Sequence, residues 1–84
     1  MQYVYVLRSD KDRNFYIGCT QDLRERLKLH NGGKVSSTRK RAPFKLIYYE
    51  AYLNTKDAYD RETYLKTRWG RNHLRKVLNH FLNS

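Results

Sequence analysis

Two short segments near the N-terminus constrain the fold more than any other feature of the chain. Residues 2–8 (QYVYVLR) and 14–19 (NFYIGC) are rich in β-branched and aromatic side chains, which favour extended strands. Only the polar pentapeptide SDKDR separates them, and a connector of this length suits a hairpin. The sequence therefore predicts two antiparallel strands that begin a small sheet.

Alternation within these segments assigns their side chains to two faces of the sheet. The apolar residues at alternating positions are Val4, Val6, Phe15 and Ile17. If these four residues cover one core layer, the strand register must place Tyr5 and Tyr16 together on the opposite face. A single strand tyrosine is usually half-buried with its hydroxyl in water, so a converging pair leaves open whether the two phenols have a function.

The rest of the chain predicts three helices and one further strand. Residues 20–33 carry a cap candidate in Thr20, an acid in Asp22 and an Asn-Gly-Gly stop, which is typical of a helix. Residues 34–43 are basic and lack periodicity, as in an exposed loop, and residues 44–52 favour a third strand.

A second helix is predicted from about Thr55 to Trp69, ended by Gly70. A third is indicated by four residues spaced for one helical face: Leu74, Val77, Leu78 and Phe81. The expected element order is β-β-α-β-α-α, in one domain that covers residues 1–84.

The charge of the chain limits its partners. Lys and Arg number 18 against 8 acidic residues, a formal net charge of +10, which favours nucleic acid as the partner. A membrane surface is less favoured, because no long helix carries the basic residues opposite an apolar face. The single cysteine, Cys19, excludes an intramolecular disulfide and a Cys-based zinc site. With no signal peptide or membrane span, we expect a protein of the reducing cytoplasm.

Two helices place polar residues on apolar faces. In the first, His30 continues the stripe of Leu23 and Leu27, with Arg26 at its edge. Taken alone, a histidine on an apolar face or an arginine at its edge is more often structural than catalytic. In the second, Glu62 lies in the apolar stripe formed by Ala58, Leu65 and Trp69. Because an unpaired buried carboxylate is costly, Glu62 either pairs with an arginine or holds a metal ion.

Six motifs in order resemble the GIY-YIG endonuclease family. YVY at 3–5 and YIG at 16–18 stand for the two tripeptides, and DLRERLKLHN and RETYLK resemble the arginine-bearing helix and the segment with the metal-binding glutamate. GK…ST…P and YYE are similar to small single-domain bacterial members. Position 3 is Tyr where the family name has Gly. The resemblance covers essentially the whole chain.

The resemblance implies an α/β protein of the α+β type, with a three-stranded antiparallel sheet flanked by helices. It implies hydrolysis of nucleic-acid phosphodiesters with one divalent ion, Mg²⁺ or Mn²⁺. The residues that match catalytic positions are Tyr5, Tyr16, Arg26, His30 and Glu62, with Glu62 as the metal ligand. Tyr5 and His30 are alternative general bases; a phenol would need a pKa lowered by roughly three units from ~10 to serve near neutrality.

Substrate contacts are expected from the motif glycine and from basic segments. Gly18 closes the second tripeptide. Hydroxyl and cationic groups of the basic loop could contact phosphates: Ser36, Ser37, Thr38, Arg39, Lys40 and Arg41. A helical set could extend this track: Lys66, Arg68, Arg71 and Arg75. Trp69 and the tyrosines of the third strand are expected to pack in the core or at its edge.

Two functions remain. The first is a metal-dependent endonuclease, with DNA favoured over RNA and without strong sequence specificity, because no separate DNA-reading domain is present. Its specificity could come from nucleic-acid structure or from a protein partner. The second is a nucleic-acid-binding module that uses the same basic surface with weak or no catalysis. A carboxylate in an apolar stripe favours the first function.

Overall fold

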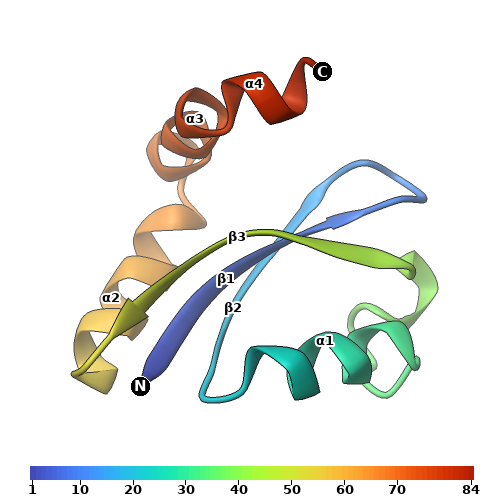
Figure 1. Cartoon of the computed structure of the whole chain (residues 1–84), viewed down its shortest axis with the longest axis horizontal. Helices are drawn as coiled ribbons and strands as arrows, with labels where there is room; N and C mark the ends of the chain where they lie inside the picture. Colours follow the sequence, from blue (N-terminus) through green and yellow to red (C-terminus); the bar gives the residue numbers. More distant parts are fainter.

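The computed structural model describes residues 1–84 and contains a three-stranded antiparallel sheet with helices on both faces (Figure 1). The strands are β1 (Gln2–Ser9), β2 (Phe15–Thr20) and β3 (Phe44–Tyr52), in the spatial order β2-β1-β3. The four α-helices are α1 (Leu23–Asn31), α2 (Thr55–Leu65), α3 (Arg68–Val77) and α4 (Asn79–Leu82). The predicted α+β class and element order are confirmed, with α4 as one short helix more.

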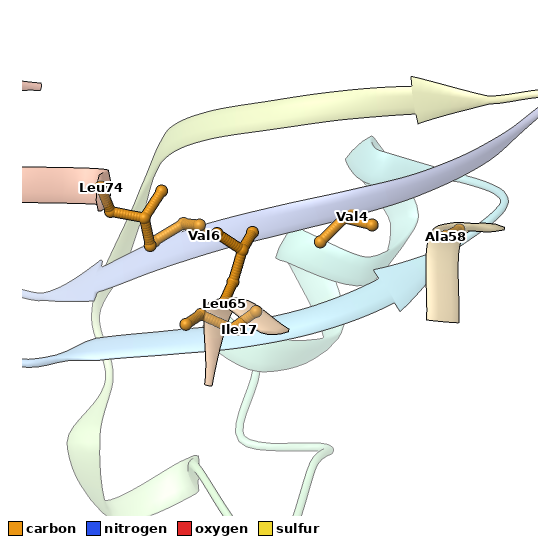
Figure 2. Packing of buried hydrophobic residues seen from close by; sticks show 6 residues of the cluster. All are labelled: Val4, Val6, Ile17, Ala58, Leu65 and Leu74. Carbon is orange, nitrogen blue, oxygen red and sulfur yellow. The ribbon is translucent and has the colours of Figure 1, made fainter. Parts of the chain in front are cut away.

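The two faces of the sheet carry separate apolar clusters. One cluster lies under α2 and α3 (Figure 2): Val4, Val6, Ile17, Ala58, Leu65 and Leu74. The other lies under α1 and centres on Tyr5, Leu7 and Phe44, with Leu23 and Leu27 of α1 packed against it. Tyr5 and Tyr16 therefore share the α1 face, as the strand alternation predicts.

A bulge in β3 changes which face its side chains reach. Register between β1 and β3 shifts at Val6 and Leu7, which pair with Tyr48 and Leu46 and leave Ile47 as the extra residue. As a result Leu46 faces α1, whereas Tyr48 packs on the opposite cluster, although both are even-numbered positions of one strand.

The boundary between the second and third helices differs from the prediction. Helix α2 ends at Leu65, Thr67 caps α3 by accepting a hydrogen bond from the Gly70 N–H, and Gly70 lies inside α3. A Cβ at position 70 would collide with the carbonyl oxygen of Tyr64, so glycine is required for close approach of the helices and not as a breaker. Trp69, expected in the core or at its edge, is 73% exposed.

Three further expectations need correction. Helix α1 is capped by Asp22, which accepts from the Glu25 N–H at 3.0 Å, while Thr20 is the last residue of β2 and accepts from the Asp22 N–H. The basic loop contains a short 3₁₀ helix, η1 (Arg39–Arg41). The expected apolar face of the last helix is buried only at Leu74, since Val77 is 49% exposed.

None of the helices has the length and hydropathy needed to span a membrane.

Candidate active site

The candidate active site begins where Tyr5 crosses Gly18. These residues are partners in the register of β1 and β2, and the Tyr5 ring lies flat against the glycine. A Cβ at position 18 would stand 2.6 Å from Tyr5 Oη, closer than any side chain allows. Glycine in the YIG segment therefore makes room for the phenol of the first strand. Gly18 itself is buried, and a contact between it and substrate stays a prediction.

A chain of hydrogen bonds links Tyr5 to α1 and to the loop that follows it. Tyr5 Oη lies 3.0 Å from His30 Nε2, and His30 Nδ1 lies 2.7 Å from Thr38 Oγ1. In one of the two His30 tautomers that these contacts allow, Thr38 donates its hydroxyl hydrogen to the Val35 carbonyl at 3.4 Å and its oxygen accepts from the Nδ1–H of His30. Nε2 is then unprotonated and accepts the Tyr5 hydroxyl. This tautomer leaves His30 able to receive a second proton from Tyr5.

Arg26 and Tyr16 complete the cluster. The Nε–H of Arg26 donates to Tyr5 Oη at 3.4 Å, and the hydrogen bond with Tyr5 and the neighbouring Tyr16 raise the pKa of the guanidinium. The Tyr16 ring meets the His30 ring edge-on, with centroids 4.9 Å apart. Four predicted site residues from β1, β2 and α1 thus form one connected cluster around Tyr5.

Burial determines the protonation of this cluster. His30 is fully buried, and desolvation together with the positive charge of Arg26 lowers its pKa to about 4. Desolvation also raises the pKa of Tyr5, with the Tyr16 and Glu62 charges acting in the same direction and Arg26 opposing them. Both groups are therefore neutral at neutral pH, and the lowered phenol pKa that direct base catalysis by Tyr5 requires is not present in the protein alone.

Glu62 approaches from α2 at the edge of its apolar stripe. Its side chain is 20% exposed and forms an ion pair with Lys66, with Oε2 and Nζ 3.0 Å apart, so the predicted arginine partner is not found. Burial raises the pKa of the Cys19 thiol to about 12, and the nearby Glu62 carboxylate acts in the same direction. One partly accessible carboxylate suits Mg²⁺, which keeps several waters and accepts few protein ligands. The residues present therefore fit a single-ion site.

The basic loop divides into buried and exposed parts. Thr38 was expected as an exposed phosphate contact, but it is fully buried as the partner of His30. Arg41 is held against the hairpin by Asp12, with Nε and Oδ2 2.7 Å apart, and that hydrogen bond lowers the pKa of Asp12 to about 2. Of the loop residues predicted to contact phosphates, those exposed to solvent are Ser36, Ser37, Arg39 and Lys40.

The helical basic residues do not form one track. Lys66 is engaged with Glu62, and Arg68 is exposed at the start of α3. Arg71 and Arg75 line a groove beside the β1–β2 hairpin, on the face of the sheet that packs against α3. The structure therefore separates these two arginines from the Tyr5 face.

A polar network missed by the sequence argument joins β3 to α2. Arg61 Nε donates to Glu50 Oε1 at 2.9 Å and Arg61 Nη2 to Glu50 Oε2 at 3.0 Å. The hydroxyls of Tyr48 and Tyr52 also donate to Glu50, each at 2.6 Å. Burial acts to raise the pKa of Glu50, but the hydrogen bonds from Arg61 and the two tyrosines outweigh it and lower that pKa. Only the sheet register and the position of α2 bring these residues together, so no local pattern signals the network.

Comparison with known proteins places this arrangement in a family. The model of the GIY-YIG catalytic domain matches residues 1–76. The chain therefore belongs to the GIY-YIG family, and the resemblance seen in its motifs is confirmed.

The relatives found are small proteins named only as UPF0213. One from Clostridium perfringens is 45% identical over 67 residues, covering 79% of this chain and 71% of the relative. One from Streptococcus pneumoniae is 45% identical over 65 residues, covering 76% and 65%. The solution NMR structure of a UPF0213 protein from Bacillus halodurans is 34% identical, has a TM-score of 0.56, and matches over 92% of this chain and 85% of that one. The fold is thus shared with a solved structure.

Proposed function

We propose that the protein is an endonuclease that hydrolyses phosphodiester bonds, most favourably in DNA, with one Mg²⁺ or Mn²⁺ ion. The observation that carries the proposal is the convergence of Tyr5, Tyr16, Arg26 and His30, with Glu62 close enough for its charge to act on Tyr5. Membership of the GIY-YIG catalytic-domain family and the net charge of +10 support it. In this proposal, nucleic-acid structure or a protein partner, and not base sequence, selects the bond that is cut.

The chain's own residues divide the work between phosphate and proton. Because Nε of Arg26 is engaged with Tyr5, its terminal amino groups remain for a non-bridging phosphate oxygen, where their attraction strengthens as charge develops. Tyr5 accepts a hydrogen bond from Arg26 and donates one to His30, which leaves one lone pair for the attacking water. Tyr16 borders the same space and positions water or phosphate.

Tyr5 and His30 act together in this proposal. As water gives a proton to Tyr5 Oη, the original phenol proton moves to His30 Nε2, and no phenolate forms. Because the protein alone lowers the pKa of His30 to about 4, this transfer requires the negative charge of the bound phosphate to raise that pKa. The Thr38 hydroxyl holds His30 in the tautomer that this transfer needs. An ion held by Glu62 would supply Lewis-acid activation of water and neutralise phosphate charge.

The test is cleavage of a labelled panel of single-stranded, double-stranded and branched DNA and RNA, with EDTA, Mg²⁺ or Mn²⁺. Wild type is compared with Glu62→Ala and with Asp60→Ala, which removes an exposed acid two residues away on the same helix. We expect metal-dependent cuts by wild type and Asp60→Ala, and a loss of roughly 100-fold or more in Glu62→Ala.

The second candidate is a binding module of the same surface. A purely structural cluster would also bury Thr38 and lower the pKa of His30. These two observations therefore also suit a binding module without catalysis. If wild type binds the panel but cuts nothing with either metal, and Glu62→Ala changes only stability, the nuclease proposal is wrong and the binding module replaces it.

A further inference from the structure

A second charged site lies away from the candidate active site. A groove of about 350 Å³ opens between the β1–β2 hairpin and helices α3 and α4. Four arginines line it, and we call it the arginine groove: Arg8, Arg13, Arg71 and Arg75. The other lining residues are asparagines and two apolar side chains, and no Asp or Glu is among them. Folding therefore gathers four positive charges where no acid of the lining balances them.

The arginines of the groove are not used in ion pairs. The three salt bridges of the protein involve Arg41, Arg61 and Lys66. Arg75 donates only to the side-chain oxygen of Asn72, a neutral group on its own helix. Like charges at close range repel each other, and the arginines of the groove have no acidic partner. An anion bound in the groove would relieve this repulsion.

Arg8 adds an independent observation. Its guanidinium lies over the Phe81 ring, 5.0 Å from the centroid, which fixes it at the base of the hairpin. Its Nε is buried and has no hydrogen-bond partner. Buried polar groups are paired in the great majority of cases, so Arg8 brings to the groove wall a guanidinium with a donor still unpaired. Phosphate oxygens pair with guanidinium groups in a bidentate manner.

The position of the groove relative to the candidate active site indicates the kind of phosphate. Asn14 and Phe15 line the groove, and Tyr16 and Gly18 of the same edge strand belong to the active site. At ~3.3 Å per strand residue, Asn14 lies about 13 Å from Gly18 along β2. Because the groove lies on the opposite face from Tyr5, it can hold only a nucleic acid that continues past the hairpin end of β2, with a phosphate every ~3.4 Å of its axis.

We propose that the arginine groove binds backbone phosphates of a nucleic acid, beyond the segment seated at the candidate active site. The inference rests on the proposed partner, nucleic acid, but not on cleavage. Arg71 and Arg75 from α3 and Arg13 from the hairpin supply the exposed charges, and Arg8 supplies the buried donor. The groove is thus a separate anchor on the far face of the sheet.

The first measurement is fluorescence anisotropy with a labelled 20-base-pair DNA duplex in EDTA, so that no metal-dependent step interferes. Arg71→Gln/Arg75→Gln is compared with Arg24→Gln/Lys56→Gln, which removes the same formal charge from exposed sites outside the groove. We expect the groove variant to weaken binding roughly tenfold or more and to lower the slope of log K against log salt by about 2. The control variant should change both much less. Circular dichroism confirms that both variants fold.

The second measurement is the NMR signal of the Arg8 Nε–H during titration with the same duplex. A shift to lower field at saturation is expected, because the orphan donor gains a phosphate acceptor. Equal effects of the groove and control variants, or an unmoved Arg8 signal, overturn the proposal. It is also overturned if the groove variant loses binding to phosphatidylserine vesicles but keeps DNA affinity. Because cleavage plays no part here, failure of the nuclease proposal and failure of this one are separate results.

Discussion

Buried neutral His30 should make the stability of the protein fall between pH 8 and pH 5. Its pKa is about 4 when folded against an ordinary value of 6.5. The unfolded chain therefore binds the extra proton first, so the contribution of His30 is fully present above pH 6.5 and is lost as pH falls through the window toward 4. The difference of 2.5 units corresponds to roughly 3 kcal/mol at most, and about 2 kcal/mol is lost by pH 5.

The assay is urea unfolding followed by far-UV circular dichroism at several pH values from 8 to 5. Trp69 is too exposed to report on the core by fluorescence. His30→Gln removes the titrating group, and His80→Gln is the matched control because His80 is an exposed histidine of α4. Wild type and His80→Gln should lose about 2 kcal/mol more than His30→Gln between pH 8 and 5.

The reasoning would be refuted by parallel pH profiles in wild type and His30→Gln. A direct check is the NMR spectrum of the imidazole, which should show a proton on Nδ1, bonded to Thr38, and no titration near pH 6.5. A protonated Nε2 at pH 7 would contradict both the tautomer and the relay from Tyr5.

Three further substitutions test the close approaches and the polar network. Gly18→Ala forces the Tyr5 ring away, because the new Cβ would lie 2.6 Å from its hydroxyl; we expect cleavage to fall roughly 100-fold and stability by about 1–3 kcal/mol, measured by nuclease assay and urea unfolding. Gly70→Ala clashes with the backbone at the end of α2 and should lower the thermal midpoint more than Gly18→Ala does; an unchanged midpoint would contradict the helix junction described above. Glu50→Gln leaves Arg61 without its counter-charge and should cost about 3 kcal/mol at pH 7. Because the folded pKa of Glu50 is below its ordinary 4.5, the wild-type advantage should persist above that pH and shrink as pH falls below it.

Local patterns predicted most of the fold and which of the candidate residues share a face. Alternation in residues 2–8 and 14–19 was sufficient to place Tyr5 and Tyr16 on one face, and helical spacing placed His30 beneath them. These predictions succeed because the period of a strand or helix decides which side chains share a face before any tertiary contact forms.

Errors arose where a residue depends on a distant segment. Gly70 was interpreted as a breaker, although its reason is the carbonyl of Tyr64 across the junction. Thr38 was interpreted as a phosphate contact, although His30 holds it in the interior. Trp69 was placed in the core or at its edge by a helix that in fact ends four residues earlier, at Leu65.

What the sequence determined by itself is the set of faces, the order of elements and the family, because each depends on local period or on motif order. Only the tertiary structure decided how those faces are used. The bulge at Ile47 turns Glu50 toward Arg61, and Gly18 lets the Tyr5 hydroxyl reach His30. The physical reason is that register, close packing and burial are properties of pairs of segments, and they determine which polar groups lose water and which find a partner.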